Sequence, residues 1–214
     1  MLRFRSSRAA IALAAFCLVP AHAAFADTAP QSAAESFVQE NIDHAYALLG
    51  NRSLSPAQRK ASFRTFLLSL TDTDRVGRFT LGQYANSASP AAVADFESAF
   101  AEYGVAVYES RLSEFKNLKI HVTGSAILKE DDTVVAAFAS GPGLPNPATP
   151  VRLGFRIRKD SNGRLILTDM EVEGIWLALW ERADFTSFLQ QHGGDVAELA
   201  RHLHSQADQL NGQQ

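Results

Sequence analysis

The first half of the chain carries apolar residues at helical spacing. The first run extends from residue 33 to residue 49, and Gly50 ends it. Three later runs each begin with a residue that can cap a helix, namely Ser55, Asp72 and Ser89, and a proline follows two of them. We therefore predict four helices. The fourth carries a stripe of bulky side chains, made of Phe96, Phe100, Tyr103, Tyr108, Leu112 and Phe115.

After residue 115 the pattern changes to alternating positions that are rich in β-branched residues, which predicts strands. The predicted strands cover residues 119–128, 133–140, 151–159 and 164–173. Residues 141–147 contain three prolines and are expected to form a loop. Helical spacing then returns in residues 183–191, which end at Gly193-Gly194, and in a last helix that starts at Asp195.

Asn162-Gly163 lies between the last two predicted strands and is a strong hairpin signal. If these two residues form the turn, apolar pairs fall on one side of the sheet and opposite charges on the other. The apolar pairs are Leu153 with Val172 and Phe155 with Met170; the charged pairs are Arg152 with Glu173 and Arg156 with Asp169. The whole pattern predicts an α+β fold: an antiparallel twisted sheet of four strands or slightly more, with N- and C-terminal helices packed on one face.

The start of the chain has the features of a secretory signal peptide. Three arginines precede an apolar run of residues 9–19, and Ala24-Phe25-Ala26 matches a cleavage site. We predict that residues 1–26 are a signal peptide and that residues 27–214 form a single domain; a retained membrane anchor is the alternative. The single cysteine, Cys17, lies within the predicted signal peptide, so the exported chain is expected to lack disulfides and thiolate metal sites.

Charge and histidine spacing argue against several classes of function. Without the three leader arginines the chain has 17 basic residues (20 − 3) against 23 acidic ones, which disfavours nucleic acid as a partner. The histidines outside the leader have no metal-ligand spacing, and no serine stands in a Gly-x-Ser-x-Gly motif. We therefore expect a protein that is not an enzyme, with no catalytic residue, no metal and no cofactor. The bulky stripe then faces either a packed core or an apolar ligand.

Several short motifs occur together in this chain: Leu81-Gly82-Gln83-Tyr84, Ser89-Pro90, the aromatic series from Phe96 to Tyr108, Pro150-Val151-Arg152, Glu173-Gly174 and Arg182-Ala-Asp-Phe185 with Gly193-Gly194. In this order they resemble the toluene-tolerance or MlaC family, from about Phe37 to Leu203. The resemblance implies an NTF2-like cone that encloses an apolar cavity. It also implies a soluble periplasmic carrier that shuttles phospholipid between the inner and outer membranes as the substrate-binding component of an ABC-type lipid transport system, which maintains outer-membrane lipid asymmetry.

The implied partners are a phospholipid, an inner-membrane ABC-type complex and an outer-membrane lipoprotein, the two proteins being bound transiently. A hopanoid-associated branch of the family is also similar near Gly193-Gly194, so a hopanoid or other polycyclic lipid is an alternative cargo. An alternative of a different class is an enzyme on an NTF2-like scaffold, with Asp169 inside the pocket.

The expected lipid-binding residues are the bulky groups that helices and sheet would turn toward such a cavity. They are Phe79, Leu81, Phe96, Phe100, Tyr103, Tyr108, Phe138, Leu153, Phe155, Met170, Val172 and Trp176. Trp176 and Trp180 depart from the family's usual pattern. Three roles stay open for them: they narrow the cavity mouth, stack on a flat ligand, or serve as ordinary packing.

Overall fold

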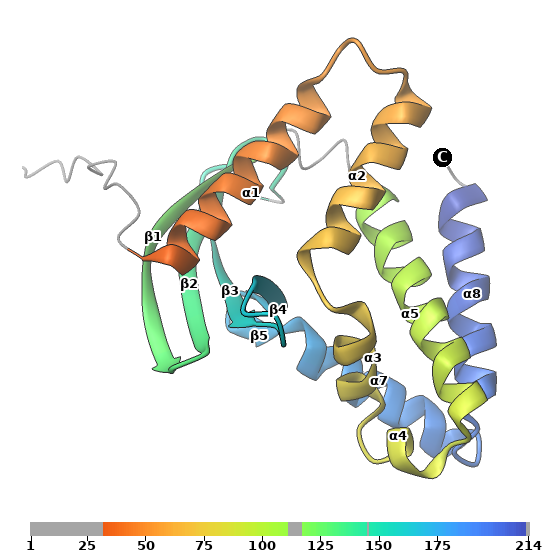
Figure 1. The fold of residues 1–214 in the computed structure, drawn as a ribbon. Helices are drawn as coiled ribbons and strands as arrows, with labels where there is room; N and C mark the ends of the chain where they lie inside the picture. Colours follow the sequence, from red (N-terminus) through yellow and green to blue (C-terminus); the bar gives the residue numbers. More distant parts are fainter. Residues whose placement is uncertain (1–31, 111–116, 145, 213–214) are drawn as a thin grey trace, which may run out of the picture.

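The computed structural model describes residues 32–110, 117–144 and 146–212, so the predicted signal peptide, Leu112 and Phe115 lie outside the described residues. The helices before the sheet are α1 Ala33–Gly50, α2 Pro56–Leu70, α3 Thr73–Leu81, α4 Tyr84–Ser87 and α5 Pro90–Ser110 (Figure 1). The strands are β1 Lys119–Lys129, β2 Asp132–Ser140, β3 Val151–Lys159, β4 Leu165–Val172 and β5 Ile175–Trp176. Helices α7 Leu177–Gln191 and α8 Val196–Gly212 follow the sheet.

The predicted helix starts in the first half of the chain are confirmed by their caps. At α2 the Ser55 hydroxyl accepts a hydrogen bond from the Gln58 backbone (3.2 Å), and the Gln58 side chain accepts one from the Ser55 backbone (2.9 Å). The Asp72 carboxylate accepts a hydrogen bond from the Arg75 backbone and so caps α3, and the Ser89 hydroxyl accepts one from the Ala92 backbone and caps α5. Local sequence therefore fixes where these helices begin. The short α4 was not predicted.

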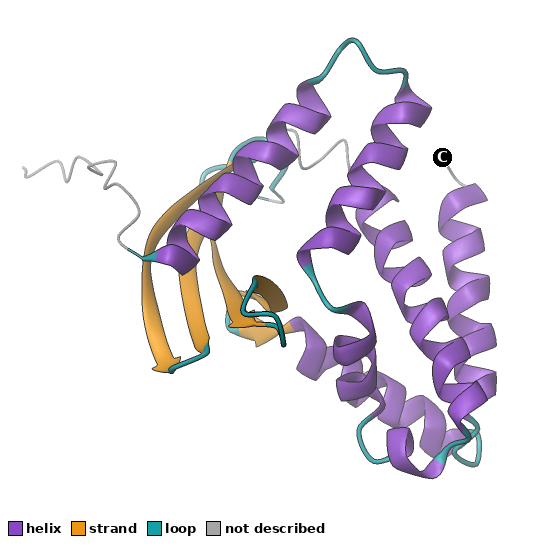
Figure 2. Ribbon diagram, in the orientation of Figure 1, coloured by secondary structure: helices purple, strands orange, loops and turns teal. Residues whose placement is uncertain are grey.

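The strands form one antiparallel sheet in the order β1-β2-β3-β4-β5, which confirms the α+β fold class (Figure 2). The predicted apolar pairs, Leu153 with Val172 and Phe155 with Met170, are confirmed. The predicted two-residue turn is wrong. Lys159 faces Leu165, and the Asp160 and Arg164 backbones are hydrogen-bonded at 2.8 Å, so the loop between them has three residues.

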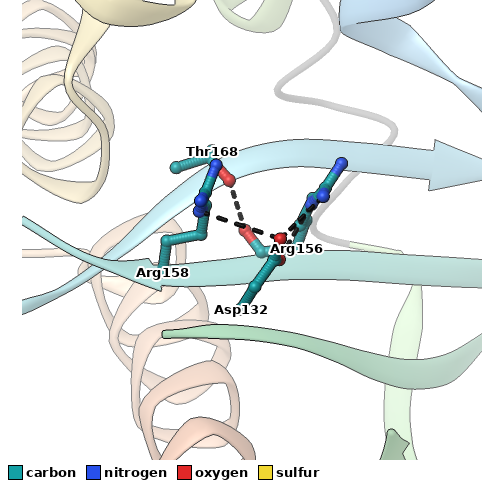
Figure 3. A network of polar contacts seen from close by, with 4 residues as sticks. All are labelled: Asp132, Arg156, Arg158 and Thr168. Atoms are coloured by element: carbon teal, nitrogen blue, oxygen red, sulfur yellow. Dashed lines mark hydrogen bonds and ion pairs between the residues drawn. The ribbon is translucent and has the colours of Figure 1, made fainter. Parts of the chain in front are cut away.

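A β-bulge at Thr168 reconciles the longer turn with the predicted pairs. The register shifts between Arg156 and Ile157 on β3, and Thr168 is the extra residue on β4. The Thr168 hydroxyl donates a hydrogen bond to the Arg156 carbonyl (3.1 Å), as Figure 3 shows. Turn and bulge each displace the pairing by one residue, and the two displacements cancel beyond Thr168.

The charged pairs are partly as predicted. Arg152 contacts Glu173 at 3.5 Å. Arg156 faces Asp169 in the register, but its guanidinium binds Asp132 through two hydrogen bonds of 2.9 and 2.7 Å (Figure 3). The predicted facing of Arg156 and Asp169 is therefore confirmed, but the expected ion pair between them is replaced, because Asp132 at the start of β2 offers Arg156 a bidentate partner that is only 1% exposed. These two hydrogen bonds hold the pKa of Asp132 below its usual value.

Two of the three apolar cores in the described residues hold α1 on the sheet and α8 against α5. Helix α1 lies across β1 and β2, where Val38 and Ile42 pack against Val135 and Ile157 (Figure 1). Helix α8 runs along α5 rather than over the sheet. The core between them has side chains that are almost wholly inaccessible to solvent, which include Phe96, Ala99, Leu189, Leu199 and Leu203. One side of the bulky stripe on α5 is therefore packed against protein.

Candidate functional site

An apolar pocket of about 250 Å³ lies where the helices meet the edge of the sheet. The end of α2, the start of α3, the second half of α5, strand β4 and the first turns of α7 form its walls. The side chains that line it are mostly aliphatic or aromatic, and include Leu67, Leu70, Val76, Phe100, Leu167, Met170 and Leu177. Leu68 also lines the pocket and is 41% exposed, so it marks the rim where the pocket meets solvent.

Helix α5 separates the packed core from the pocket. Phe96 is fully buried against α7 and α8, with its ring edge-on to Phe185 at 5.7 Å. One turn later Phe100 is only partly buried, and it lines the pocket together with Tyr103 and Tyr108. The bulky stripe thus serves both purposes that the sequence left open: its first part fills a core, and its second part walls a cavity.

Four of the twelve residues predicted to bind lipid line this pocket: Phe100, Tyr103, Tyr108 and Met170. Two others, Leu81 and Phe96, belong to the closed core against α7 and α8, where no space is left for a ligand. The stripe on α5 is broader than the pocket, which explains why neighbouring aromatic residues end in different places.

The other six lie away from the pocket lining. Leu153, Phe155 and Val172 are partly buried on the sheet, and Phe155 packs in the core beneath α1. Two are exposed: Phe79 lies under the Arg182 guanidinium (5.1 Å), and Phe138 stands on β2. The sixth, Trp176, is partly buried in the short β5, while the neighbouring Trp180 is 56% exposed.

Sequence reasoning missed the contribution of α2 to the site, and on α3 it selected Phe79 and Leu81 where Thr73 and Val76 line the pocket. Phe66, Leu67 and Leu68 are consecutive, and three adjacent positions on a helix cannot all face one core. Phe66 enters a buried cluster with Phe63, while Leu67 and Leu68 turn to the pocket. This run of apolar residues at the end of α2 was the available signal.

Asp169 joins the pocket wall to the start of α7. Its Oδ1 accepts hydrogen bonds from the backbone N–H groups of Met170 (2.8 Å) and Ala178 (2.9 Å). Burial raises the pKa of Asp169, and the two N–H groups partly offset that rise. The predicted start of this helix at residue 183 is wrong: α7 begins at Leu177, where Trp176 provides no side-chain cap and the carboxylate from β4 takes over that role.

Glu181 is the second carboxylate in the pocket wall. It lies on α7 one turn after Leu177 and Ala178, which also line the pocket. Burial raises the pKa of Glu181 to about 7, and nearby Asp184 adds to the rise. The pKa values of Tyr103 and Tyr108 are raised as well, first by burial and then by these carboxylates. The pocket is therefore apolar with an acidic end, and none of the described residues that line it is Lys, Arg or His.

Within the described residues, no cluster of three His, Cys, Asp or Glu side chains is placed to bind a metal. The histidines have other contacts: His44 packs edge-on to Phe66, His192 and His202 stack on Phe188, and His204 contacts Glu102 at 2.8 Å. Among the helices that the structure describes, none combines the length and apolar character needed to cross a bilayer.

Comparison with known proteins supplies a family and a fold. The family model described as MlaC protein matches residues 39–205 of the chain. A solved structure of a phospholipid-binding protein from Ralstonia solanacearum, in complex with a phospholipid, is similar with a TM-score of 0.68. The match is 20% identical in sequence and covers 82% of this chain and 97% of that chain, so it shows a shared fold. No curated protein matches the chain significantly.

Proposed function

The chain belongs to the MlaC family, and on this premise we propose that it is a soluble periplasmic carrier that binds a phospholipid in the pocket and moves it between membranes. The observation that carries the proposal is the pocket between α5, β4 and α7, whose lining is mainly apolar and whose rim reaches solvent at Leu68. Each CH₂ group that leaves water for such a lining contributes about 0.8 kcal/mol to the free energy of binding, so the entry of an acyl chain is favoured by several kcal/mol.

The size of the pocket suggests how a lipid enters. Its volume of about 250 Å³ lies just below the range of roughly 300–1,000 Å³ that is usual for small-molecule sites. One acyl segment can enter first, and the walls must move apart to accommodate a second chain. Met170 suits such a wall because its unbranched side chain adapts to different shapes.

Family membership also supports the wider role of substrate-binding component in an ABC-type lipid transport system. In that role the protein would meet an inner-membrane complex and an outer-membrane lipoprotein in turn, after residues 1–26 have been removed as a signal peptide. Phospholipid is the preferred cargo over a hopanoid, because Trp176 and Trp180 do not line the pocket. The solved relative with a bound lipid likewise holds a phospholipid.

A carrier role fits Asp169 better than an enzymatic role. One of its two oxygens is already occupied by two backbone donors, and these contacts fix the start of α7. A catalytic carboxylate needs a partner group placed to act on a substrate. The other acidic residue of the lining, Glu181, stands among apolar and phenolic groups, so the pocket offers binding surface rather than a catalytic pair.

A transfer assay tests the carrier role. Sucrose-loaded phosphatidylcholine vesicles with a trace of radiolabelled phosphatidylglycerol are mixed with the purified protein and then sedimented. We expect labelled lipid in the supernatant in proportion to the protein added. Gly104 lines the pocket, and a Cβ at this position would meet no atom within 4 Å. A leucine side chain would therefore occupy the space that the acyl chain needs, and Gly104→Leu should abolish this transfer.

Ala94→Leu is the matched control, because Ala94 lies on the exposed side of the same helix. It should transfer lipid like the unchanged protein. Absence of labelled lipid from the supernatant at every protein concentration would refute the carrier role. Equal transfer by both variants would refute the assignment of the pocket.

A further inference from the structure

Glu181 is a carboxylate in an apolar wall, and no counter-ion stands beside it in the part of the chain that the structure describes. No hydrogen bond or ion pair joins its side chain to another described residue. The neighbouring Arg182 points elsewhere: its guanidinium lies over the Phe79 ring at 5.1 Å and beside Gly82. An ionised carboxylate in this position depends on the water that enters the open pocket for its solvation.

None of the described groups around Glu181 offers it a positive charge. Helix α5 contributes the phenols Tyr103 and Tyr108, and strand β4 contributes Asp169. On α7 itself the nearby charge is Asp184. Helices α2 and α3 add only Leu, Thr and Val side chains to the pocket. The arginine on the neighbouring strand β3, Arg156, is held by Asp132.

We infer that lipid binding in this pocket is coupled to the uptake of one proton from solvent by Glu181, which makes Glu181 the residue that sets how tightly the pocket holds hydrocarbon. This inference rests on the proposed function. A hydrocarbon chain that fills the pocket displaces the water around the carboxylate, and the charged form then loses its remaining solvation. The neutral carboxylic acid loses far less solvation free energy, so the occupied pocket favours the protonated form of Glu181.

The sign of the pH dependence follows from this linkage. In the open pocket the pKa of Glu181 is already about 7 because of burial, and lipid raises it further. Below pH 7 the carboxyl group is neutral and binding is strongest. Above pH 7 a proton must be taken up with each lipid, so the Kd rises by up to tenfold per pH unit.

The test measures the Kd at pH 6.0, 7.0 and 8.5 for two probes: dioleoyl-phosphatidylglycerol and dioleoyl-phosphatidylcholine. Neither headgroup changes its charge over this range. We expect both probes to bind about 30-fold more weakly at pH 8.5 than at pH 6.0, which is the limit for a group of pKa 7 whose charged form is excluded. Glu181→Gln should bind both tightly with no pH dependence. Glu40→Gln, at an exposed position on α1, should keep the full dependence.

Each contrary outcome is distinct. If the carboxylate instead bound the ammonium group of phosphatidylcholine, that probe would bind more tightly as the pH rises, and the inference would be wrong. A pH dependence seen with phosphatidylglycerol alone would mean repulsion of its headgroup and would also overturn it. A constant Kd for both probes would refute the inference while leaving the carrier role intact. Failure of the protein to bind either probe at any pH would instead refute the proposed function.

Discussion

The backbone N–H of Ala178 donates a hydrogen bond of 2.9 Å to the carboxylate of Asp169. This contact connects the first turn of α7 to strand β4, nine positions earlier in the chain. It also places Leu177 and Ala178 in the pocket wall, one turn before Glu181. A polar contact thus positions an apolar surface.

Replacement of Asp169 by Ala should remove this cap. Loss of a helix-capping oxygen costs about 1 kcal/mol, and we expect a decrease of this size in the free energy of unfolding, measured by urea titration at pH 7. Asp169→Asn keeps an acceptor oxygen and should lose less. Equal losses for the two variants would show that charge, rather than the cap, is what matters at this position.

Glu181→Gln should stabilise the lipid-free protein at high pH only. The pKa of this acid is raised in the folded state, from 4.5 to about 7, so the folded state holds its proton more strongly than the unfolded state. The protonated form of Glu181 therefore contributes to the stability of the folded state, and this contribution is complete below pH 4.5 and is lost as the pH rises through 7. We expect the variant to be more stable than the unchanged protein by roughly 2 kcal/mol at pH 8, after allowance for partial solvent access, and equally stable at pH 4.5. Urea titrations at the two pH values provide the check, and a gain of equal size at both would contradict it.

Gly104→Leu should raise the melting temperature of the delipidated protein. Glycine within a helix is less favourable than alanine by about 0.5–1 kcal/mol, and the added side chain enters open space in the pocket. A variant that is more stable and yet carries no lipid would separate the role of the cavity from that of the core. A lower melting temperature would mean that the space around Gly104 is already filled.

Asp132→Asn should destabilise the sheet. Asp132 is almost completely buried and accepts two hydrogen bonds from Arg156, and loss of such charge-assisted bonds costs about 1–3 kcal/mol. Because the pKa of Asp132 is lowered in the folded state, its contribution is present above the ordinary value of 3.8 and is lost as the pH falls below it. The difference between variant and unchanged protein, measured by denaturant titration, should therefore be large at pH 7 and small at pH 2. A difference that persists at pH 2 would argue against the ion pair.

Features that depend on neighbouring residues were predictable from the sequence. The capping box of Ser55 and Gln58 and the pairing of Phe155 with Met170 are set by short-range patterns, and both are present. The turn length was not predictable, because the bulge at Thr168 compensates for the extra loop residue and leaves the apolar pairs unchanged. The start of α7 could not be found either, since its cap comes from another element.

Tertiary packing also determines which residues line the pocket. Phe96 and Phe100 belong to one stripe, one helical turn apart, and the packing of α7 and α8 on this stripe decides that the first is core and the second is pocket wall. The contribution of Leu67 and Leu68 required the end of α2 to face β4. Periodicity identifies apolar faces, while the packing of helices determines which faces remain open to a ligand.

Native mass spectrometry of the protein purified without detergent shows whether the pocket holds lipid. We predict a species heavier than the chain by the mass of one phospholipid, identified by extraction and fragmentation, and its absence from Gly104→Leu. A bare protein mass for the unchanged chain, with no lipid in the extract, would mean that the pocket is not a lipid site.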